Sequence, residues 1–287
     1  MSETVSLTRN VPSFRTKRRQ TRKNLKYVIL GIVFLLIMLF PVYWMINTSL
    51  QPSGNTINAG LFPFDPDFSG YKRAISDQGS NLVTSLVIAL GTVVLTLVIA
   101  TPASYALAKF KYRWINIALL AVLIAQMIPS IVIANALYAA YNQIGLLNSI
   151  TGLILADATA AIPFAIMIMR AFMMSIPPSI IEAARVDGAG HLRTFNAIVV
   201  PVAKNSLITA SLFAFLWSWS DFLFALTLTT NDSITPVTLG IYEYLGTQVQ
   251  NWGAVMATAV LSSIPAIVLL LLAQRYISAG ATGGAVK

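Results

Sequence analysis

Residues 82–108 read LVTSLVIALGTVVLTLVIATPASYALA, without a single Asp, Glu, Lys or Arg. A helix of roughly 20 apolar residues crosses the ~30 Å hydrocarbon core of a bilayer, so this stretch is long enough to span it. Its apolar residues run on continuously instead of alternating with polar ones, which favours a helix over a barrel strand. The stretch therefore predicts a transmembrane helix.

Five further stretches have a similar length and apolar character: 27–48, 114–139, 150–172, 205–229 and 252–276. The sequence therefore predicts an all-α membrane protein with six transmembrane helices. The first of them is expected to be an anchor and not a signal peptide, because the polar tail 1–26 precedes it. The composition agrees, since 56% of the 287 residues are hydrophobic and only 10% are charged. Soluble domains carry about 25% charged residues, so a soluble enzyme is excluded.

The sequence also excludes several kinds of chemistry. There is no cysteine, and His191 is the only histidine, which leaves no thiolate site, multi-histidine metal site or histidine relay. No GxxxxGK-S/T phosphate loop occurs. We therefore expect this chain to bind no metal, nucleotide or other cofactor of its own.

The basic residues are distributed unevenly along the chain. Only Lys72 and Arg73, of the 19 Lys and Arg residues, lie in the loops 49–81, 140–149 and 230–251. The others lie in the tail 1–26, around the turn 109–113, around 173–204, and from residue 275 onward. Because basic segments stay in the cytoplasm, both termini are predicted to be cytoplasmic. The basic tail adjoins a span, so we expect it to contact lipid headgroups and no nucleic acid.

The predicted cytoplasmic segment 173–204 contains the signals for a short helix. Ser179-Ile180-Ile181-Glu182 matches a capping box in which Ser179 is the N-cap and Glu182 bonds back to it. Gly188 suits the left-handed residue that ends a helix. We therefore expect about two helical turns, which are marginal alone in water and need something to dock against.

Small and apolar residues extend this interpretation. Ala183 and Ala184 are expected to let the backbone of the short helix approach a partner closely. After Gly190, apolar residues at helical spacing predict a stretch that lies along the membrane surface and ends at Pro201. These residues are Leu192, Phe195, Ile198 and Val199.

The same segment resembles a known motif. Glu182-Ala183-Ala184, followed by Gly188 and then by Ile198-Val199-Val200-Pro201, is similar to the EAA loop of inner-membrane permease subunits in binding-protein-dependent ABC importers. Val200 stands where leucine is usual. Over roughly 27–287 the chain resembles the carbohydrate, maltose-permease-like branch of that family. The stretches that carry this resemblance are YALAKF at 105–110, GLLN at 145–148, IPFA at 162–165 and WSDFLFAL at 219–226.

The resemblance implies a type I ABC importer permease (MetI-like) architecture in the bacterial inner (plasma) membrane. In that architecture 82–276 is the permease core and 277–287 is a cytoplasmic C-terminal tail. The implied solute is a sugar. The implied partners are a second homologous permease subunit, an ATPase subunit dimer that binds ATP and Mg, and an extracytoplasmic solute-binding protein.

The resemblance also implies that the short helix couples this chain to the ATPase. The residues expected to form the docking element are Ser179, Glu182, Ala183, Ala184, Asp187 and Gly188. The alternative is that Glu182 only caps the helix, and that the helix merely connects two spans.

Two acidic residues, Asp157 and Asp221, lie inside predicted spans. An ionisable residue in a span is costly and usually faces a cavity or a partner. One interpretation is a solute pathway in which these carboxylates accept hydrogen bonds from solute hydroxyls. The other is a structural hydrogen bond to a neighbouring helix, or a position close enough to the interface to stay hydrated.

Aromatic and polar residues add further candidates for the translocation path. Trp217 and Trp219 lie on different faces of the predicted fifth helix, next to Ser220 and Asp221. Indole rings stack on the C–H faces of sugars, but packing between helices is the favoured explanation. Around Pro129, where a kink is expected, three residues add polar surface: Gln126, Asn135 and Tyr138.

Other functions remain open at this point. An ion-gradient-driven secondary transporter predicts charged relays in several spans and internal repeats. The sequence has two acidic residues in its spans and no repeat. An ABC importer permease for a solute other than a sugar is a further alternative. An intramembrane enzyme needs a convergent catalytic set, and His191 lies away from both aspartates.

Overall fold

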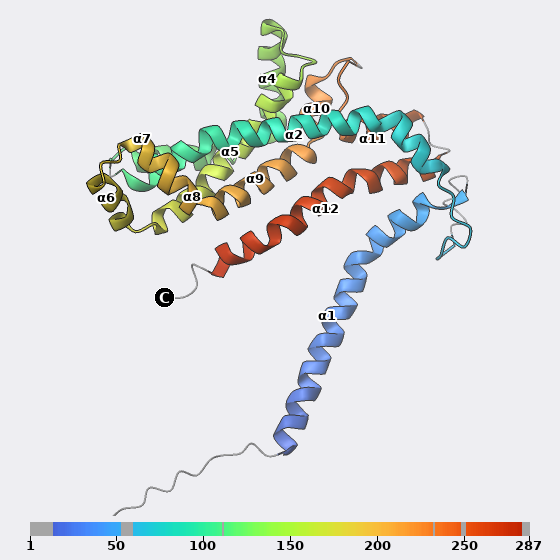
Figure 1. The fold of residues 1–287 in the computed structure, drawn as a ribbon. Coiled ribbons are helices and arrows are strands. Elements are labelled where there is room, and N and C mark those ends of the chain that lie inside the picture. Colours follow the sequence, from blue (N-terminus) through green and yellow to red (C-terminus); the bar gives the residue numbers. More distant parts are fainter. Residues whose placement is uncertain (1–13, 53–59, 111, 232, 248–250, 283–287) are drawn as a thin grey trace, which may run out of the picture.

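The structure is a computed structural model that describes residues 14–52, 60–110, 112–231, 233–247 and 251–282. Residues 1–13 and 283–287 of the two predicted tails lie outside this description. Within the described ranges all regular elements are helices, as the sequence predicted (Figure 1). Side chains are described from Leu25 to Gln274, with the same internal gaps, and at Tyr276.

Four of the predicted spans are continuous helices that are long and apolar enough to cross a membrane. They are α1 (Phe14–Ser49), α2 (Ser69–Lys109), α5 (Ile150–Ser175) and α12 (Trp252–Thr282). Each extends beyond its predicted span, so α1 continues into the segment predicted as a tail and α2 begins inside the loop predicted for 49–81. Pro102, Pro163 and Pro265 lie inside these helices without ending them.

The kink expected at Pro129 is confirmed, and it is sharp enough to divide the predicted span 114–139 into two helices. The span forms α3 (Ile115–Ala125) and α4 (Ser130–Ile144), which meet at 93°. Pro129 precedes α4 with an extended backbone (φ −58°, ψ 133°). A proline has no amide hydrogen and keeps the residue before it out of the helical region, so α3 cannot run on into α4.

The predicted span 205–229 is also divided. It forms α9 (Lys204–Trp219) and the short α10 (Leu223–Leu228), separated by Ser220, Asp221 and Phe222. Ser220 donates its hydroxyl to the Leu216 carbonyl at 2.6 Å, and Asp221 accepts backbone amides of α10. Short polar side chains that bond to nearby backbone groups compete with a continuous helix, which explains the break.

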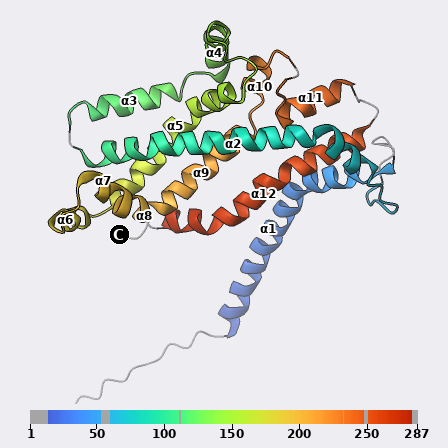
Figure 2. The ribbon, with the colours of Figure 1, turned by 45° about the horizontal axis from the view of Figure 1, so that its top comes forward.

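Helix α2 is the centre of the bundle. It packs against α5, α9, α12 and α11 (Val237–Thr247), and Figure 2 shows it running along most of the length of the bundle. Many of the contacts use small residues. Ala100 of α2, Ala165 of α5 and Ala210 of α9 are buried in one cluster with Met169 and Met173. Small side chains let membrane helices approach closely, where van der Waals contact replaces the hydrophobic effect.

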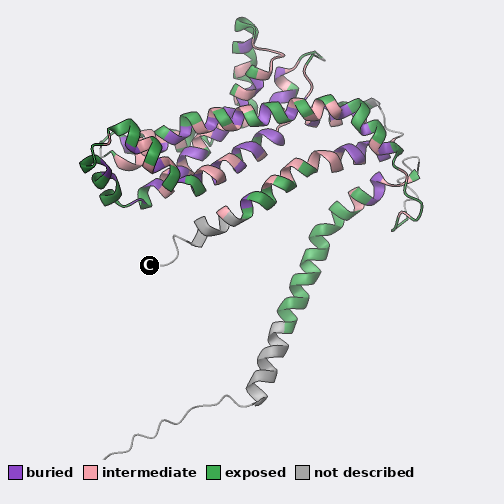
Figure 3. Ribbon diagram, in the orientation of Figure 1, coloured by how far each residue is buried: buried purple, intermediate pink, exposed green. Residues whose placement is uncertain are grey.

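Helix α1 leaves the bundle. Near its C-terminal end Asn47, Thr48 and Ser49 are buried, whereas its described side chains from Leu25 to Val42 are exposed. Figure 3 shows this exposed part extending away from α12. An apolar helix surface of this size needs lipid or another protein to cover it.

Candidate functional site

The short helix predicted in 173–204 is α6 (Pro178–Val186), but it does not begin with the predicted capping box. Its N-cap is Pro177 and its first residue is Pro178, so Ser179 lies inside the first turn. No side chain of the described residues caps this start. A proline at the first helical position has the right φ and no amide hydrogen to satisfy, so the helix can begin there without a side-chain cap.

The predicted end of α6 is confirmed. Gly188 has φ +82°, in the left-handed region that glycine adopts without strain. The amide of Ala189 donates to the Ala184 carbonyl at 2.9 Å, and that of Gly188 donates to the Arg185 carbonyl at 3.0 Å. These two bonds form a Schellman motif, which satisfies carbonyls at the helix end. Asp187 is the exposed C-cap residue.

The side chains on the inner and outer faces of α6 differ from the prediction at Ala184. Ile181 and Ala184 are buried, and Ile181 packs with Met173, Ile176 and Val199. Successive helical residues are rotated by about 100°, so Ala183 points outward while Ala184 points into this chain. The expectation that Ala184 faces a partner is therefore wrong. The outward face consists of Ser179, Glu182, Ala183 and Val186, and Val186 is 87% exposed.

A second helical stretch follows α6, as the apolar spacing predicted. It consists of α7 (His191–Thr194), a π-helical turn η2 (Phe195–Val199) and α8 (Val200–Val202). The π turn ends two residues before Pro201, whose missing amide hydrogen interrupts the regular hydrogen-bond ladder. The stretch ends at Val202 and not at this proline, and it meets α9 at 75°.

The ends of α2 and α5 are joined by two basic side chains. Lys109 of α2 donates its Nζ to the carbonyl of Ile176, the residue after α5, at 2.7 Å. Arg170 of α5 donates its Nε to the carbonyl of Leu107 in the last turn of α2, at 3.2 Å. Carbonyls at a helix C-terminus lack intrahelical partners and carry partial negative charge, which favours a cation there. We call Lys109, Arg170 and their two acceptors the α2–α5 clasp.

Further contacts extend the clasp toward the segment after α6. Ser104 donates to the Met173 sulfur at 3.3 Å, and the rings of Tyr105 and Phe195 lie 5.3 Å apart. The sequence interpretation treated Lys109 and Arg170 only as topogenic charges. Their positions in the last turns of two apolar helices are the signal that could have identified them.

A buried polar cluster lies where α2, α5 and α9 meet. Ser218 of α9 donates its hydroxyl to Asp157 Oδ2 of α5 at 2.5 Å and lies 3.3 Å from the Thr92 hydroxyl of α2. Asp157 is 2% exposed. Nearby, the Ser85 hydroxyl of α2 accepts the amide of Val237 at 2.8 Å. Asp157 and Ser218 thus connect helices that are distant in sequence, and Asp157 is enclosed in the bundle.

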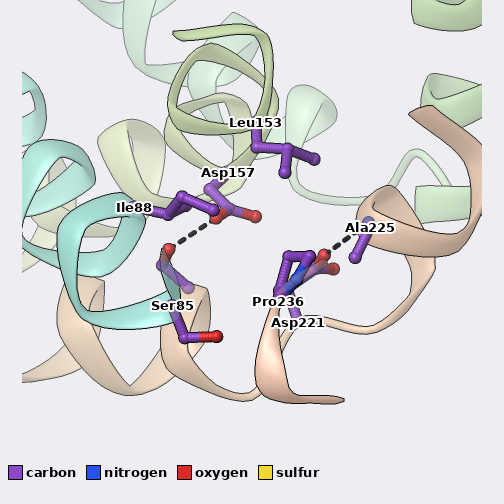
Figure 4. A pocket seen from close by; sticks show the side chains of 8 residues that line it. Ser85, Ile88, Leu153, Asp157, Asp221, Ala225 and Pro236 are labelled. Carbon is purple, nitrogen blue, oxygen red and sulfur yellow. Dashed lines mark hydrogen bonds between the residues drawn. The ribbon is translucent and has the colours of Figure 1, made fainter. Parts of the chain in front are cut away.

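Asp221 lies next to this cluster and organises the break in the fifth span. Its carboxylate accepts the amides of Phe224 at 3.3 Å and Ala225 at 3.0 Å, at the start of α10. Its main-chain carbonyl accepts the hydroxyl of Thr238 at 2.5 Å. Asp157, Ser218 and Asp221 line the same small cavity, together with Ser85 (Figure 4). The structure therefore brings the two predicted acidic residues together and adds Ser218, which sequence reasoning missed.

The two tryptophans have different environments, as predicted. Trp219 is buried, stacks on Phe215 with ring centroids 5.5 Å apart, and donates its Nε1 to the Ser262 carbonyl of α12 at 2.9 Å. It therefore holds α9 against α12. Trp217 is 46% exposed on another face of α9.

Trp217 lines a groove of about 290 Å³ between α3, α5 and α9. Gln126 lies in the same groove, and Phe164 and Phe213 add aromatic surface with ring centroids 5.0 Å apart. Ser220 is exposed at the end of α9. Asn135 and Tyr138 are exposed on α4 and line neither this groove nor the cavity at Asp157. Of the predicted path residues, Asp157 and Asp221 therefore line the cavity, Gln126 and Trp217 line the groove, and the other four line neither.

Polar contacts also hold the connection after α10. Asn148 has φ +54°, and its side-chain oxygen accepts the amides of Thr230 at 2.6 Å and Asn231 at 3.2 Å. The main-chain amide of Asn148 donates to the Leu228 carbonyl at 3.0 Å. One asparagine therefore joins the loop before α5 to the loop after α10.

The N-terminal part of α2 is fixed to α11 by a tyrosine. Tyr244 donates its hydroxyl to Asp77 Oδ2 at 3.0 Å, and Arg73 Nε lies 3.5 Å from the same oxygen. Burial raises the pKa of the Tyr244 hydroxyl, and the Asp77 carboxylate raises it further. The phenol therefore stays protonated and remains a donor at neutral pH.

Comparison with known proteins identifies the family. Residues 100–282 match the family model described as the binding-protein-dependent transport system inner membrane component. The chain belongs to this family. The matched region extends from the C-terminal quarter of α2 through α12, so it includes α6, the clasp and both aspartates of the cavity.

Individual relatives cover nearly the whole chain. The trehalose transport system permease protein SugB of Mycobacterium tuberculosis is 33% identical over 270 residues, which are 93% of this chain and 98% of the relative. The trehalose/maltose transport system permease protein MalG of Thermococcus litoralis is 29% identical over 275 residues, 94% and 99% of the two chains. Among solved structures, a chain of a bacterial ABC transporter involved in the import of the acidic polysaccharide alginate has a TM-score of 0.77 and 26% identity, with 93% and 99% coverage.

These findings establish a multi-pass membrane permease of ABC transporters with the predicted all-helical architecture. Among the described residues, four of the predicted spans are continuous helices, and α3 with α4 is a bent pair that corresponds to the span predicted for 114–139. A second bent pair joins residues 191–202, which lie outside the predicted spans, to α9. The position of α6 agrees with the motif that first indicated the family, since it lies between α5 and the helices that lead into α9.

Replacing Asp221 tests its role at the break. Asp221→Ala removes the acceptor for two amides at the start of α10, so we expect a loss of stability of about 0.5–2 kcal/mol, as for other helix caps. Asp221→Asn keeps an acceptor oxygen and should lose less. Thermal unfolding of the purified complex measures both variants. An alanine variant as stable as the wild type would show that these hydrogen bonds contribute nothing.

Proposed function

We propose that this chain is one of two transmembrane subunits of an ATP-driven sugar importer, and that α6 connects it to a separate ATPase dimer. The observation that carries this proposal is α6 itself. It is a short helix that begins and ends without help from a partner, and its outward face is exposed. A partner surface that binds this face would move the helix as a rigid body.

The chain needs such a partner because it has no phosphate-binding loop in its sequence. ATP and Mg would bind to the ATPase subunits and not to this chain. The excess of Lys and Arg around α6 and in both tails supports a cytoplasmic location for these segments. An extracytoplasmic solute-binding protein would deliver the sugar on the opposite side.

Helix α2 is the element through which movement of α6 would reach the path. The clasp fixes the end of α2 to Ile176, directly before α6. Further along the same helix, Thr92 and Ser85 contact the buried polar cluster. A displacement at one end of a continuous helix is transmitted to the other end, because the backbone hydrogen bonds keep its length fixed.

The groove at Trp217 supports a sugar as the solute. Indole and phenyl rings offer flat apolar surface for sugar C–H groups, and the Gln126 amide both donates and accepts hydrogen bonds. Relatives of this chain are named for trehalose and for trehalose or maltose transport. A second homologous permease would complete the pathway, and the exposed surface of α1 provides area for it or for lipid.

Reconstitution tests the proposed function. We expect uptake of a radiolabelled disaccharide, chosen from a panel that includes trehalose and maltose, only when both permeases, the ATPase, the binding protein and ATP are present. Liposomes that contain this chain alone should take up none. Uptake by this chain alone, or uptake driven by an ion gradient without ATP, would contradict the proposal.

A bulky residue on the outward face of α6 tests the coupling contact. Ala183→Trp should reduce uptake and binding-protein-stimulated ATP hydrolysis about tenfold, equivalent to ~1.4 kcal/mol of lost docking energy. Ala183→Ser keeps the residue small and serves as the matched control, with near-normal activity. Normal coupling in the tryptophan variant would show that this face does not contact the ATPase.

The clasp allows an independent test of transmission. Lys109→Met keeps the aliphatic stem but removes the cation that bonds to Ile176. Sugar uptake per ATP hydrolysed should therefore fall about threefold or more, which corresponds to a coupling energy in the usual range. ATP hydrolysis itself should continue. Arg113→Met removes a positive charge from the turn that follows α2 and is the control. An unchanged ratio of uptake to hydrolysis in Lys109→Met would exclude this role.

A further inference from the structure

The cavity between α2, α5, α9 and α10 is small and has a polar lining. Its volume is about 10 Å³, close to the space that one water-sized body occupies. Ser85, Asp157, Ser218 and Asp221 supply oxygen atoms, and the remaining lining residues are apolar or proline. Three stretches that are distant in sequence, around Ser85, Asp157 and Ser218–Asp221, therefore direct polar side chains to one point.

One oxygen of this lining has no partner. Asp157 Oδ2 accepts the Ser218 hydroxyl, but Oδ1 is buried and makes no hydrogen bond within the described part of the chain. In Figure 4 a dashed line marks a hydrogen bond at one carboxyl oxygen of Asp157, and none is drawn at the other. A buried carboxylate oxygen without a donor or a cation is costly, so a partner for it is required.

The charges around the cavity define what that partner must be. None of the eight described residues that line it is basic. The Asp221 carboxylate is stabilised by two backbone amides of α10. The Ser218 hydroxyl is the only hydrogen-bond donor to the Asp157 carboxyl among the described residues. The charge missing from the lining is therefore the positive charge that would balance an ionised Asp157.

We propose that this cavity binds one sodium ion, held by Asp157 and the oxygens of Ser85, Ser218 and Asp221. Carboxylate and hydroxyl oxygens are ligands for hard cations. The cavity is too small for an ion that keeps its hydration shell, as Mg²⁺ usually does, and it offers fewer side chains than the six to eight ligands of Ca²⁺. A monovalent ion also matches the single missing charge.

The ion would connect moving parts of the permease. Ser85 belongs to α2, Asp157 to α5 and Ser218 to α9, while Asp221 holds the start of α10. A cation shared among them stabilises the arrangement in which these four segments meet. Its role is structural and does not depend on the sugar, so it is separate from the ATP-driven step of the proposed function.

Direct binding of ²²Na⁺ to the purified complex, without sugar or ATP, tests the site. The wild type should bind one more ²²Na⁺ ion per copy of this chain than the Asp157→Asn variant binds. Unlabelled Na⁺ should displace the bound ²²Na⁺ better than K⁺ does. Asp65→Asn, which changes an exposed aspartate outside the cavity, should bind as the wild type does. Equal binding by wild type and Asp157→Asn would overturn the proposal.

Thermal unfolding of the wild type provides a measurement that does not rely on any variant. A ligand that binds only the folded state raises the midpoint of thermal unfolding. The midpoint in NaCl should therefore be higher than the midpoint in N-methylglucamine chloride at equal ionic strength. No difference between the salts would overturn the sodium site. A midpoint that changes with pH and not with Na⁺ would assign the missing charge to a proton instead. Because no transport is measured, either result is distinguishable from failure of the proposed importer function.

Discussion

The close packing of α2 against α5, α9 and α12 is the interaction on which the rest of the structure depends. In a bilayer the hydrophobic effect does not hold helices together, so association relies on van der Waals contact and on interhelical hydrogen bonds. Buried alanines supply the first, at Ala100, Ala165 and Ala210. The clasp at one end of α2, and the cluster at Thr92 and Ser218, supply the second.

The breaks in the helices obey a second constraint of the membrane. Backbone groups outside helices find no water in the bilayer core, so irregular segments occur only where protein groups satisfy them. At the α9–α10 break, Asp221 and Thr238 provide these partners. The loop after α10 is held by Asn148 in the same way. The broken fifth span is therefore a stable feature of the fold, and it places Asp221 beside Asp157.

Helix α6 combines local independence with tertiary attachment. Pro178 starts it and the Schellman motif at Gly188 ends it, both without a partner chain. Ile181 anchors its inner face in the cluster around Met173, while Glu182 and Ala183 remain on the outside. A helix held on one side and exposed on the other is suited to transmit a displacement from a partner into α2.

The sequence by itself determined the positions of the four continuous apolar spans, the family, the left-handed end at Gly188, and the different faces of Trp217 and Trp219. These properties depend on local composition and helical periodicity, which can be read from short stretches of consecutive residues. Sequence reasoning anticipated the kink at Pro129 but failed at Ser179, because Pro178 offered an earlier start than the capping box. It also failed at Ser220, where a span predicted as continuous is broken. Only the tertiary structure decided that Ala184 is buried, that Lys109 bonds to Ile176, and that Asp157 meets Ser218 and lies beside Asp221. The physical reason is that these contacts join residues tens of positions apart, and which helices become neighbours is fixed by their packing together and not by any one of them.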